Sequence, residues 1–211
     1  MQRLTAASGA ILMALVIGCG TGTPSSVPSP SPATPVPSGA RTLEAGLAEA
    51  GTYTMTRFQP RLTLHIDDGW LVLFPDDDDE FALEDLADKT VFYGSRVAQV
   101  VDPGSGVGDA PDDLVAWLVD HPDLEASAPA ATTVDTLPAT SIDVTNEDTT
   151  DTDLFAFPTG NFHIPPGVRL RFIVVPMDGP DLVIYTGGPI DRFDAAIART
   201  QPMLESLRVG D

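Results

Sequence analysis

Residues 62–74 read LTLHIDDGWLVLF, and this stretch does most to decide the fold that we predict. Apolar and polar residues alternate through residues 62–66, which is the period-two pattern of a half-buried strand. Asp67-Asp68-Gly69 is a turn signal, and a second apolar run follows it from Trp70 to Phe74. The stretch therefore predicts two antiparallel strands joined by a tight turn.

Further strands are predicted on both sides of this hairpin. The clearest is residues 168–177, where every second residue from Val168 to Val174 is apolar and Arg169 and Arg171 occupy the other face. The glycine-rich residues 104–110 and the polar residues 145–153 are predicted to be loops. The remaining predicted strands cover residues 51–57, 81–86, 91–101, 131–134, 139–144 and 182–186.

Two helices are predicted among these strands. The first has Pro111, Asp112 and Asp113 in its first turn and is expected to end at Pro122. Its apolar stripe consists of Leu114, Trp117 and Leu118 at spacings of three and four residues. The second extends from about Asp191 to Leu207, with Pro202 expected to kink or divide it. Many antiparallel strands with few helices predict an α+β fold, a mostly antiparallel sheet flanked by helices.

The first 18 residues have the features of a signal peptide. A short polar start with Arg3 precedes the apolar run GAILMALVI at residues 9–17, which is too short to span a bilayer. The run ends in Val16-Ile17-Gly18-Cys19, which looks like the lipobox of bacterial lipoproteins. That resemblance implies cleavage between Gly18 and Cys19 and acylation of the Cys19 thiol, with the mature chain anchored on the extracytoplasmic face of the cell membrane. A plain signal peptide is the alternative.

Residues 19–40 predict a tether between the anchor and the rest of the chain. Six prolines and no charged residue lie between Gly20 and Gly39, so this segment has too little apolar surface to fold. Extended proline-rich chain of this length reaches about 60 Å. Residues 41–211 then form the single predicted globular domain.

The composition excludes several classes of partner and site. The 31 Asp and Glu residues outnumber the 11 Lys and Arg residues, for a formal net charge of −20, which disfavours binding to nucleic acid. The only cysteine is Cys19, so the domain has no thiol for a disulfide, a nucleophile or a thiolate metal site.

Several segments together resemble a family of uncharacterised bacterial lipoproteins, known mainly from actinobacteria and related high-GC groups. They are the hairpin at residues 62–70, the helix APDDLVAWL at residues 110–118 with HPDL at 121–124, and the ending PMLESLRV at residues 202–209. The resemblance implies a PsbP-like α/β/α sandwich. Members of that wider fold mostly act as accessory, binding or assembly factors, so the resemblance favours a non-catalytic role.

No assembled catalytic motif is visible in the sequence. His65 is predicted on the solvated face of a strand, and His121 at the C-terminal end of a helix where a cation is favoured. His163 is predicted in a loop over the core, beside the aromatic residues Phe155, Phe157 and Phe162. These histidines share no metal-ligand spacing. Gly104–Gly108 is too short for a phosphate-binding loop and lacks the following lysine, and no Gly-x-Ser-x-Gly sequence is present.

Two acidic runs are the sharper candidates for a site: Asp76–Glu80, and the acidic residues between Asp143 and Asp153, which include Asp151. Their carboxylates are the hard oxygen ligands that Ca²⁺ prefers, although neither run matches the calcium-loop pattern. A weak cation site and a merely solvated surface remain open alternatives. The candidate cation-binding residues are Asp76, Asp77, Asp78 and Asp79 in one run and Glu147 and Asp148 in the other.

The sequence thus predicts a membrane-tethered lipoprotein whose domain binds an unknown protein or small molecule without catalysis or a resident cofactor. Two other classes stay open. One is an enzyme that uses a pair of carboxylates with pKa values pushed apart. The other is a surface protein that responds to Ca²⁺, which would raise its melting temperature.

The Cys19→Ala variant tests the predicted anchor. We expect the wild-type chain to gain the mass of a diacylglyceryl group and to sediment with membranes, because two acyl chains give stable anchoring. The variant should do neither. Intact-mass spectrometry and membrane fractionation measure both, and a wild-type chain that stays soluble and unmodified would contradict the prediction.

Overall fold

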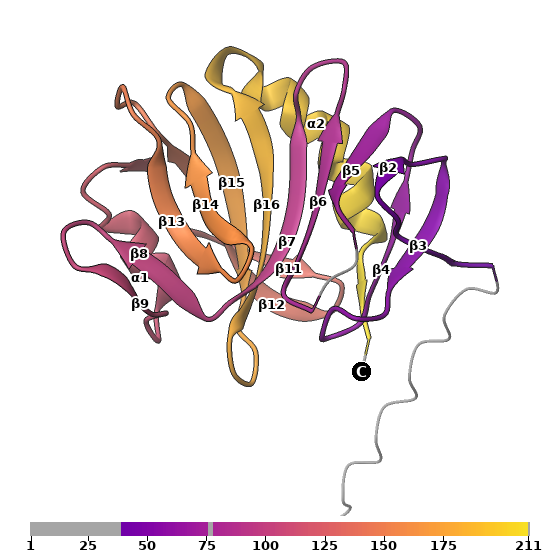
Figure 1. The fold of residues 1–211 in the computed structure, drawn as a ribbon, viewed down its shortest axis with the longest axis horizontal. Helices are drawn as coiled ribbons and strands as arrows, with labels where there is room; N and C mark the ends of the chain where they lie inside the picture. Colours follow the sequence, from indigo (N-terminus) through magenta and orange to yellow (C-terminus); the bar gives the residue numbers. More distant parts are fainter. Residues whose placement is uncertain (1–38, 76–77, 211) are drawn as a thin grey trace, which may run out of the picture. The chain divides into compact units, whose positions relative to one another are not determined.

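The computed structural model describes residues 39–75 and 78–210 (Figure 1). The described residues do not include the predicted signal peptide with Gly18, the predicted lipidation site Cys19, or residues 20–38 of the predicted tether. No helix in the described part of the chain is long and apolar enough to cross a membrane.

A central sheet of nine antiparallel strands organises the described residues. Its strand order is β10-β12-β15-β16-β7-β6-β5-β2, and β11 pairs with β12. The predicted strand at residues 168–177 is confirmed as β15, next to the middle of this sheet. The strands are β2 (Gly46–Leu47), β5 (Trp70–Phe74), β6 (Glu80–Asp85), β7 (Val91–Val97), β10 (Glu125–Ala126), β11 (Ala130–Val134), β12 (Leu137–Thr145), β15 (Val168–Val175) and β16 (Asp181–Pro189).

One face of the central sheet packs against helix α2 (Phe193–Ser206) and a four-stranded sheet, here called the N-terminal sheet. The short helix η1 (Ile190–Arg192) leads into α2. Leu83 and Ile184 of the central sheet share one core with Leu64 and Met203 from the covering layer. The N-terminal sheet consists of β1 (Arg41–Thr42), β3 (Gly51–Met55), β4 (Leu62–Ile66) and β17 (Arg208–Val209).

The opposite face carries a second core under helix α1 (Leu114–Val119) and another four-stranded sheet, here called the hairpin sheet. Phe172 and Tyr185 of the central sheet pack with Phe155 of the hairpin sheet and with Leu118 of α1. The hairpin sheet consists of β14 (Gly160–Ile164), β13 (Thr152–Phe157), β8 (Gln99–Asp102) and β9 (Gly106–Asp109), in that order.

The prediction of a hairpin at residues 62–74 is wrong in its pairing. Both strands exist, but β4 pairs with β3 and β17, whereas β5 pairs with β6 and β2. The turn at Asp67–Gly69 therefore carries the chain from one layer to the other. Leu64 of β4 and Trp70 of β5 are both fully buried in the same core. Two strands in different sheets can both bury these side chains in the core between the sheets.

The helical content is lower than the prediction of a sheet flanked by helices implies. The layers on both sides of the central sheet are built largely from strands, with α1 and α2 as smaller parts. Residues 104–110, predicted to be a loop, contain β9, and His163 lies on β14 rather than in a loop. Helix α2 continues through Pro202, which is exposed, so this proline does not divide it.

His121 differs from its predicted role as a cation at a helix end. It is buried after α1, and its Nδ1 accepts a hydrogen bond from the backbone N–H of Asp123 at 3.3 Å. Burial lowers the pKa of His121 and outweighs the nearby aspartates, so the neutral form is favoured. His65, in contrast, is exposed on β4 as predicted.

Arg199 of α2 ties the helix to both layers. Its Nε donates to Asp85 Oδ2 on β6 at 2.7 Å, its Nη2 donates to the backbone oxygen of Asp68 at 2.8 Å, and its guanidinium lies over the Trp70 ring at 5.2 Å. Burial alone would raise the pKa of Asp85. The hydrogen bonds from Arg199 and from the Ala87 backbone outweigh burial and hold this pKa below its usual value.

The Asp85–Arg199 pair should make the stability depend on acid. Because the pKa of Asp85 is lower in the folded than in the unfolded chain, the ionised carboxylate stabilises the fold above about pH 4, and this stability is lost as the pH falls through the folded-state pKa. We expect Asp85→Asn to lower the free energy of unfolding at pH 7 by about 1–3 kcal/mol and to flatten its decline in acid.

Urea unfolding at a series of pH values measures this effect. The control is Glu49→Gln, because Glu49 pairs with Arg41 on the exposed surface, and it should leave the stability profile unchanged. An acid dependence that is the same in Asp85→Asn and wild type would contradict the assignment.

Candidate apolar binding pocket

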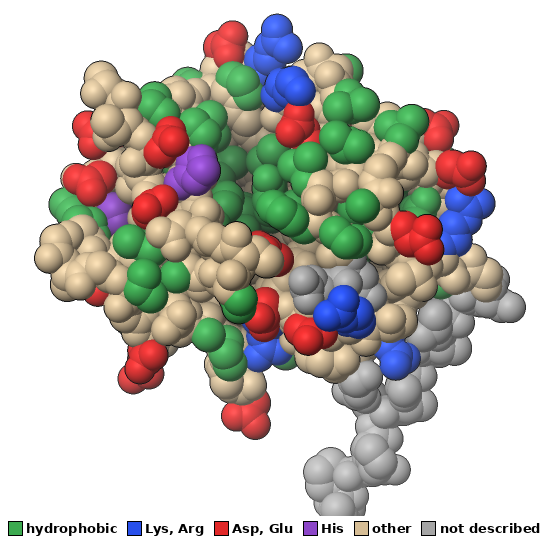
Figure 2. All heavy atoms as spheres, viewed as in Figure 1, with side chains coloured by type: hydrophobic (Ala, Val, Ile, Leu, Met, Phe, Trp, Pro, Cys, Tyr) green, Lys and Arg blue, Asp and Glu red, His purple; other side chains and the backbone are tan. Residues whose placement is uncertain are grey.

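A pocket of about 460 Å³ lies between the hairpin sheet and the central sheet. In the face shown in Figure 2, hydrophobic side chains gather around a hollow over the middle of the central sheet. The pocket exists because the β13–β14 hairpin covers only part of this face of the sheet. It is lined by Leu73, Phe74, Glu80, Lys89, Val91, Tyr93, Phe157, Thr159, Gly160, Asn161, Phe162, His163, Pro165, Val168, Leu170, Gly188 and Pro189; we call this set the β14 pocket.

Aromatic rings form one wall of the β14 pocket. Tyr93 of β7 stacks on Tyr185 of β16 with ring centroids 4.9 Å apart and an interplanar angle of 8°. Phe162 of β14 covers both rings, at 5.8 Å from Tyr93 and 4.4 Å from Tyr185. Tyr185 is fully buried, and Ser95 Oγ donates to its hydroxyl at 3.1 Å. Tyr185 thus fixes the stack from below, while Tyr93 and Phe162 present surface to the pocket.

The Tyr93 phenol stays neutral far into the alkaline range. Burial raises its pKa to about 12, and the negative charges of Glu84 and Glu80 add to this effect. Within residues 39–75 and 78–210, no protein group forms a hydrogen bond with this hydroxyl. It therefore offers the pocket both a hydrogen-bond donor and an acceptor.

Glu80, at the start of β6, places a carboxylate in the pocket wall. Its residue surface is only 7% exposed, and its Oε1 accepts a hydrogen bond from Thr159 Oγ1 at 2.5 Å. Thr159 lies in the turn between β13 and β14. The bond therefore fastens this hairpin to the central sheet beside the pocket.

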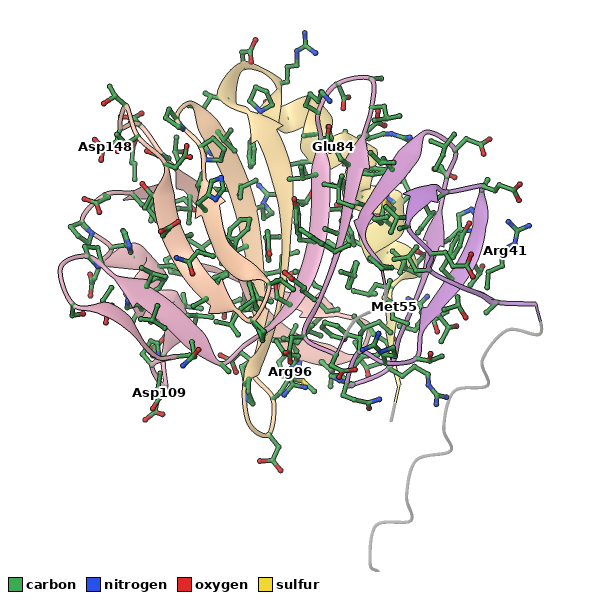
Figure 3. The ribbon with its side chains drawn as sticks, in the orientation of Figure 1. Arg41, Met55, Glu84, Arg96, Asp109 and Asp148 are labelled. Atoms are coloured by element: carbon green, nitrogen blue, oxygen red, sulfur yellow. The ribbon has the colours of Figure 1, made fainter. Side chains whose placement is uncertain are left out.

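Two further polar residues that line the pocket, Lys89 and His163, lie at its rim, and each is close to an acidic side chain. Glu84, at the upper end of β6 in Figure 3, accepts a hydrogen bond from Lys89 Nζ at 2.6 Å. His163 Nε2 lies 3.8 Å from Asp151 Oδ2, and both side chains are about half exposed. These rim groups are in contact with solvent, in contrast to Glu80.

The acidic residues predicted as cation ligands are not brought together. Asp76 and Asp77 lie outside the described residues. Asp78 Oδ1 is 3.4 Å from Arg57 Nε, and Asp79 accepts the backbone N–H of Arg96 through its own carbonyl oxygen. Glu147 and Asp148 are exposed between β12 and β13. Figure 3 shows Asp148 at the upper left and Arg96, which bonds to Asp79, near the bottom centre.

A second cavity, of about 420 Å³, contains three aspartates of the second predicted run, Asp148, Asp151 and Asp153, together with two that the sequence did not group with them. Among the described residues, no three acidic, histidine or cysteine side chains are arranged to hold a metal ion. The Ca²⁺ hypothesis stays a prediction for both runs. The aspartates of this cavity are Asp102, Asp123, Asp148, Asp151 and Asp153.

Sequence reasoning missed most of the β14 pocket. It grouped the aromatic residues Phe155, Phe157 and Phe162 beside His163, and this grouping is confirmed. It did not connect them with Tyr93 or Glu80, which lie 60 or more residues earlier in the chain. The available signal was the two-residue spacing of Tyr93 and Ser95, which places both on one face of β7.

Comparison with known proteins finds similarity at the level of structure. No protein-family model matches the chain, and no curated protein sequence matches it. The chain is similar to the solution structure of cyanobacterial PsbP (CyanoP) from Synechocystis sp. PCC 6803, with a TM-score of 0.44 and 12% sequence identity over 78% of this chain and 94% of that chain. The sequence resemblance described above names the same PsbP-like fold.

The Tyr93→Phe variant tests the electrostatics of the pocket. We expect Tyr93 to ionise near pH 12, because burial and the two glutamates disfavour the phenolate. The ultraviolet absorbance of phenolate is titrated in wild type and in the variant. Subtracting the variant curve from the wild-type curve gives the ionisation of Tyr93 alone.

Circular dichroism at each pH controls for unfolding. A difference curve with its midpoint near pH 10, where an unperturbed tyrosine titrates, would contradict the description of Tyr93.

Proposed function

We propose that this chain is a lipoprotein, anchored through Cys19 on the extracytoplasmic face of the membrane, whose domain binds a small and mainly apolar ligand without catalysis. The observation that carries the binding proposal is the β14 pocket. Its volume of about 460 Å³ falls within the range of small-molecule sites, and aromatic and aliphatic side chains with a few polar groups are typical of such sites.

The exposed apolar residues at the rim indicate that the pocket is a ligand site and not a gap in the packing. Leu73 and Phe74, on β5, are 36% and 42% exposed and border the same hollow. Exposed apolar surface that continues into a pocket is typical of a ligand site. Covering a side chain of this size removes apolar surface that is worth roughly 1.5–3 kcal/mol when fully buried.

The polar contacts of the pocket suit a site that is formed before the ligand arrives. Glu80 and Thr159 fasten the β13–β14 hairpin to β6, and the Tyr93–Tyr185 stack is held by Ser95. A preformed site avoids the cost of ordering loops and side chains on binding. The proline-rich tether would hold such a domain clear of the membrane surface, with its pocket accessible.

Binding of the neutral fluorescent probe N-phenyl-1-naphthylamine to the full chain carrying Cys19→Ala tests the proposal without interference from the lipid. We expect saturable binding. Phe74→Ala and Phe162→Ala should each weaken it about 5-fold, because each removes apolar contact that is worth about 1 kcal/mol.

The control is Leu86→Ala, because Leu86 is 49% exposed but does not line the pocket. Melting temperatures establish that every variant is folded. Absent binding, or binding that Phe74→Ala and Phe162→Ala weaken no more than Leu86→Ala does, would refute the proposed site.

A further inference from the structure

The hydroxyl of Tyr93 is a polar group that the protein leaves available in the β14 pocket. Tyr93 lines the pocket and is partly exposed. In the described part of the chain, no protein group is hydrogen-bonded to its hydroxyl. A single polar group in a mainly apolar pocket is what fixes the orientation of a small ligand and gives the site its specificity.

The neighbours of Tyr93 in the central sheet explain why its hydroxyl is unpaired. Ala82, opposite Tyr93 on β6, has no polar side-chain atom. Tyr185, opposite Tyr93 on β16, stacks against its ring, and the Tyr185 hydroxyl accepts a hydrogen bond from Ser95. Val91 lies two residues earlier on the same face of β7 and is apolar. The sheet therefore holds the ring of Tyr93 without supplying an acceptor for its hydroxyl.

The other hydroxyl, amide and ammonium side chains that line the pocket already donate to carboxylates. These donor–acceptor pairs are Thr159 with Glu80, Lys89 with Glu84, and Asn161 with Asp153. Among these donors of the described residues, the Tyr93 hydroxyl is the one that remains for a ligand.

Tyr93 keeps its proton at every physiological pH. Burial raises its pKa to about 12, and the negative charges of Glu84 and Glu80 add to this effect. The group that faces the pocket is therefore a neutral O–H donor and not a phenolate. A donor shielded from water costs free energy when it has no acceptor, and a ligand oxygen would remove this cost.

The surroundings of this donor are apolar. Phe74 lies opposite Ala82 on β5, two strands from Tyr93, and the ring centroid of Phe162 is 5.8 Å from that of Tyr93. Both phenylalanines line the pocket. A ligand that rests on them loses hydration from any polar group it places there, and a charged group would lose most. A neutral ligand with an apolar body and one oxygen suits this arrangement.

We infer that the β14 pocket selects neutral ligands that carry one oxygen acceptor, such as a ketone carbonyl, bonded to the Tyr93 hydroxyl, with the apolar body of the ligand against Phe74 and Phe162. This inference rests on the proposed binding function. It adds the chemical class of the ligand and the residue that selects it.

Two naphthalene derivatives of nearly equal shape test the inference. They are 2-acetylnaphthalene and 2-isopropenylnaphthalene, in which C=CH₂ replaces the C=O of the ketone. Equilibrium dialysis measures the affinity of each for the Cys19→Ala full chain, with and without Tyr93→Phe. We expect Tyr93→Phe to weaken binding of the ketone at least about 5-fold, because its carbonyl loses a donor in an apolar site, and to leave binding of the hydrocarbon unchanged.

Tyr53→Phe is the matched control, because it also removes one tyrosine hydroxyl. Tyr53 lies on β3 in the N-terminal sheet, which covers the other face of the central sheet, and its hydroxyl donates to the backbone oxygen of Glu49 at 2.7 Å. This variant should leave both affinities unchanged. Melting temperatures establish that both variants are folded.

The outcomes separate the inference from the function on which it rests. If Tyr93→Phe weakens both ligands equally or weakens neither, or if Tyr53→Phe weakens the ketone as much, Tyr93 does not select the oxygen. The inference is then overturned while the apolar site stands. The same conclusion follows if the ketone does not bind but the hydrocarbon or N-phenyl-1-naphthylamine does. If none of the three compounds binds, the proposed function itself fails.

Discussion

The central sheet is apolar on both of its faces, and the rest of the structure depends on the need to cover both. Strands β7, β15 and β16 contribute alternate residues to two separate cores, so neither face is left to solvent. Burial of this surface is the main favourable contribution to the free energy of folding. The chain covers one face with α2 and the N-terminal sheet, and the other with α1 and the hairpin sheet. Where the second cover ends, the β14 pocket begins.

Local patterns predicted the strands well where one face was clearly apolar. The alternation in residues 168–177 identified β15, and the helix predicted from about Asp191 to Leu207 corresponds to α2. Which strands pair with each other was harder to predict from the sequence, as the turn at residues 67–69 shows. A turn signal between two apolar runs is compatible with a hairpin in one sheet or with a corner between two sheets. The choice depends on α2, which packs on β4 and bonds to β6 through Arg199, more than 100 residues later.

The candidate site was predictable only in fragments. The aromatic residues around His163 are close in sequence, so their grouping needed no knowledge of the fold. Tyr93 and Glu80 join them only because β7 lies beside β16 in the central sheet and β6 lies beside β7. Acidic runs drew attention because charge is easy to count, but the sequence alone does not distinguish Glu80 from the four aspartates that precede it. Its significance comes from burial, which depends on tertiary structure.

Lys89 has a consequence for chemistry performed on the protein. It is the only lysine in the sequence, and it lies at the rim of the β14 pocket with most of its side chain exposed. Amine-directed reagents therefore meet one side chain in the whole protein, in addition to any free N-terminal amine. A fluorophore or a surface linkage attached there would sit at the entrance of the pocket. The chain thus carries a natural attachment point at the place where occupancy would be observed.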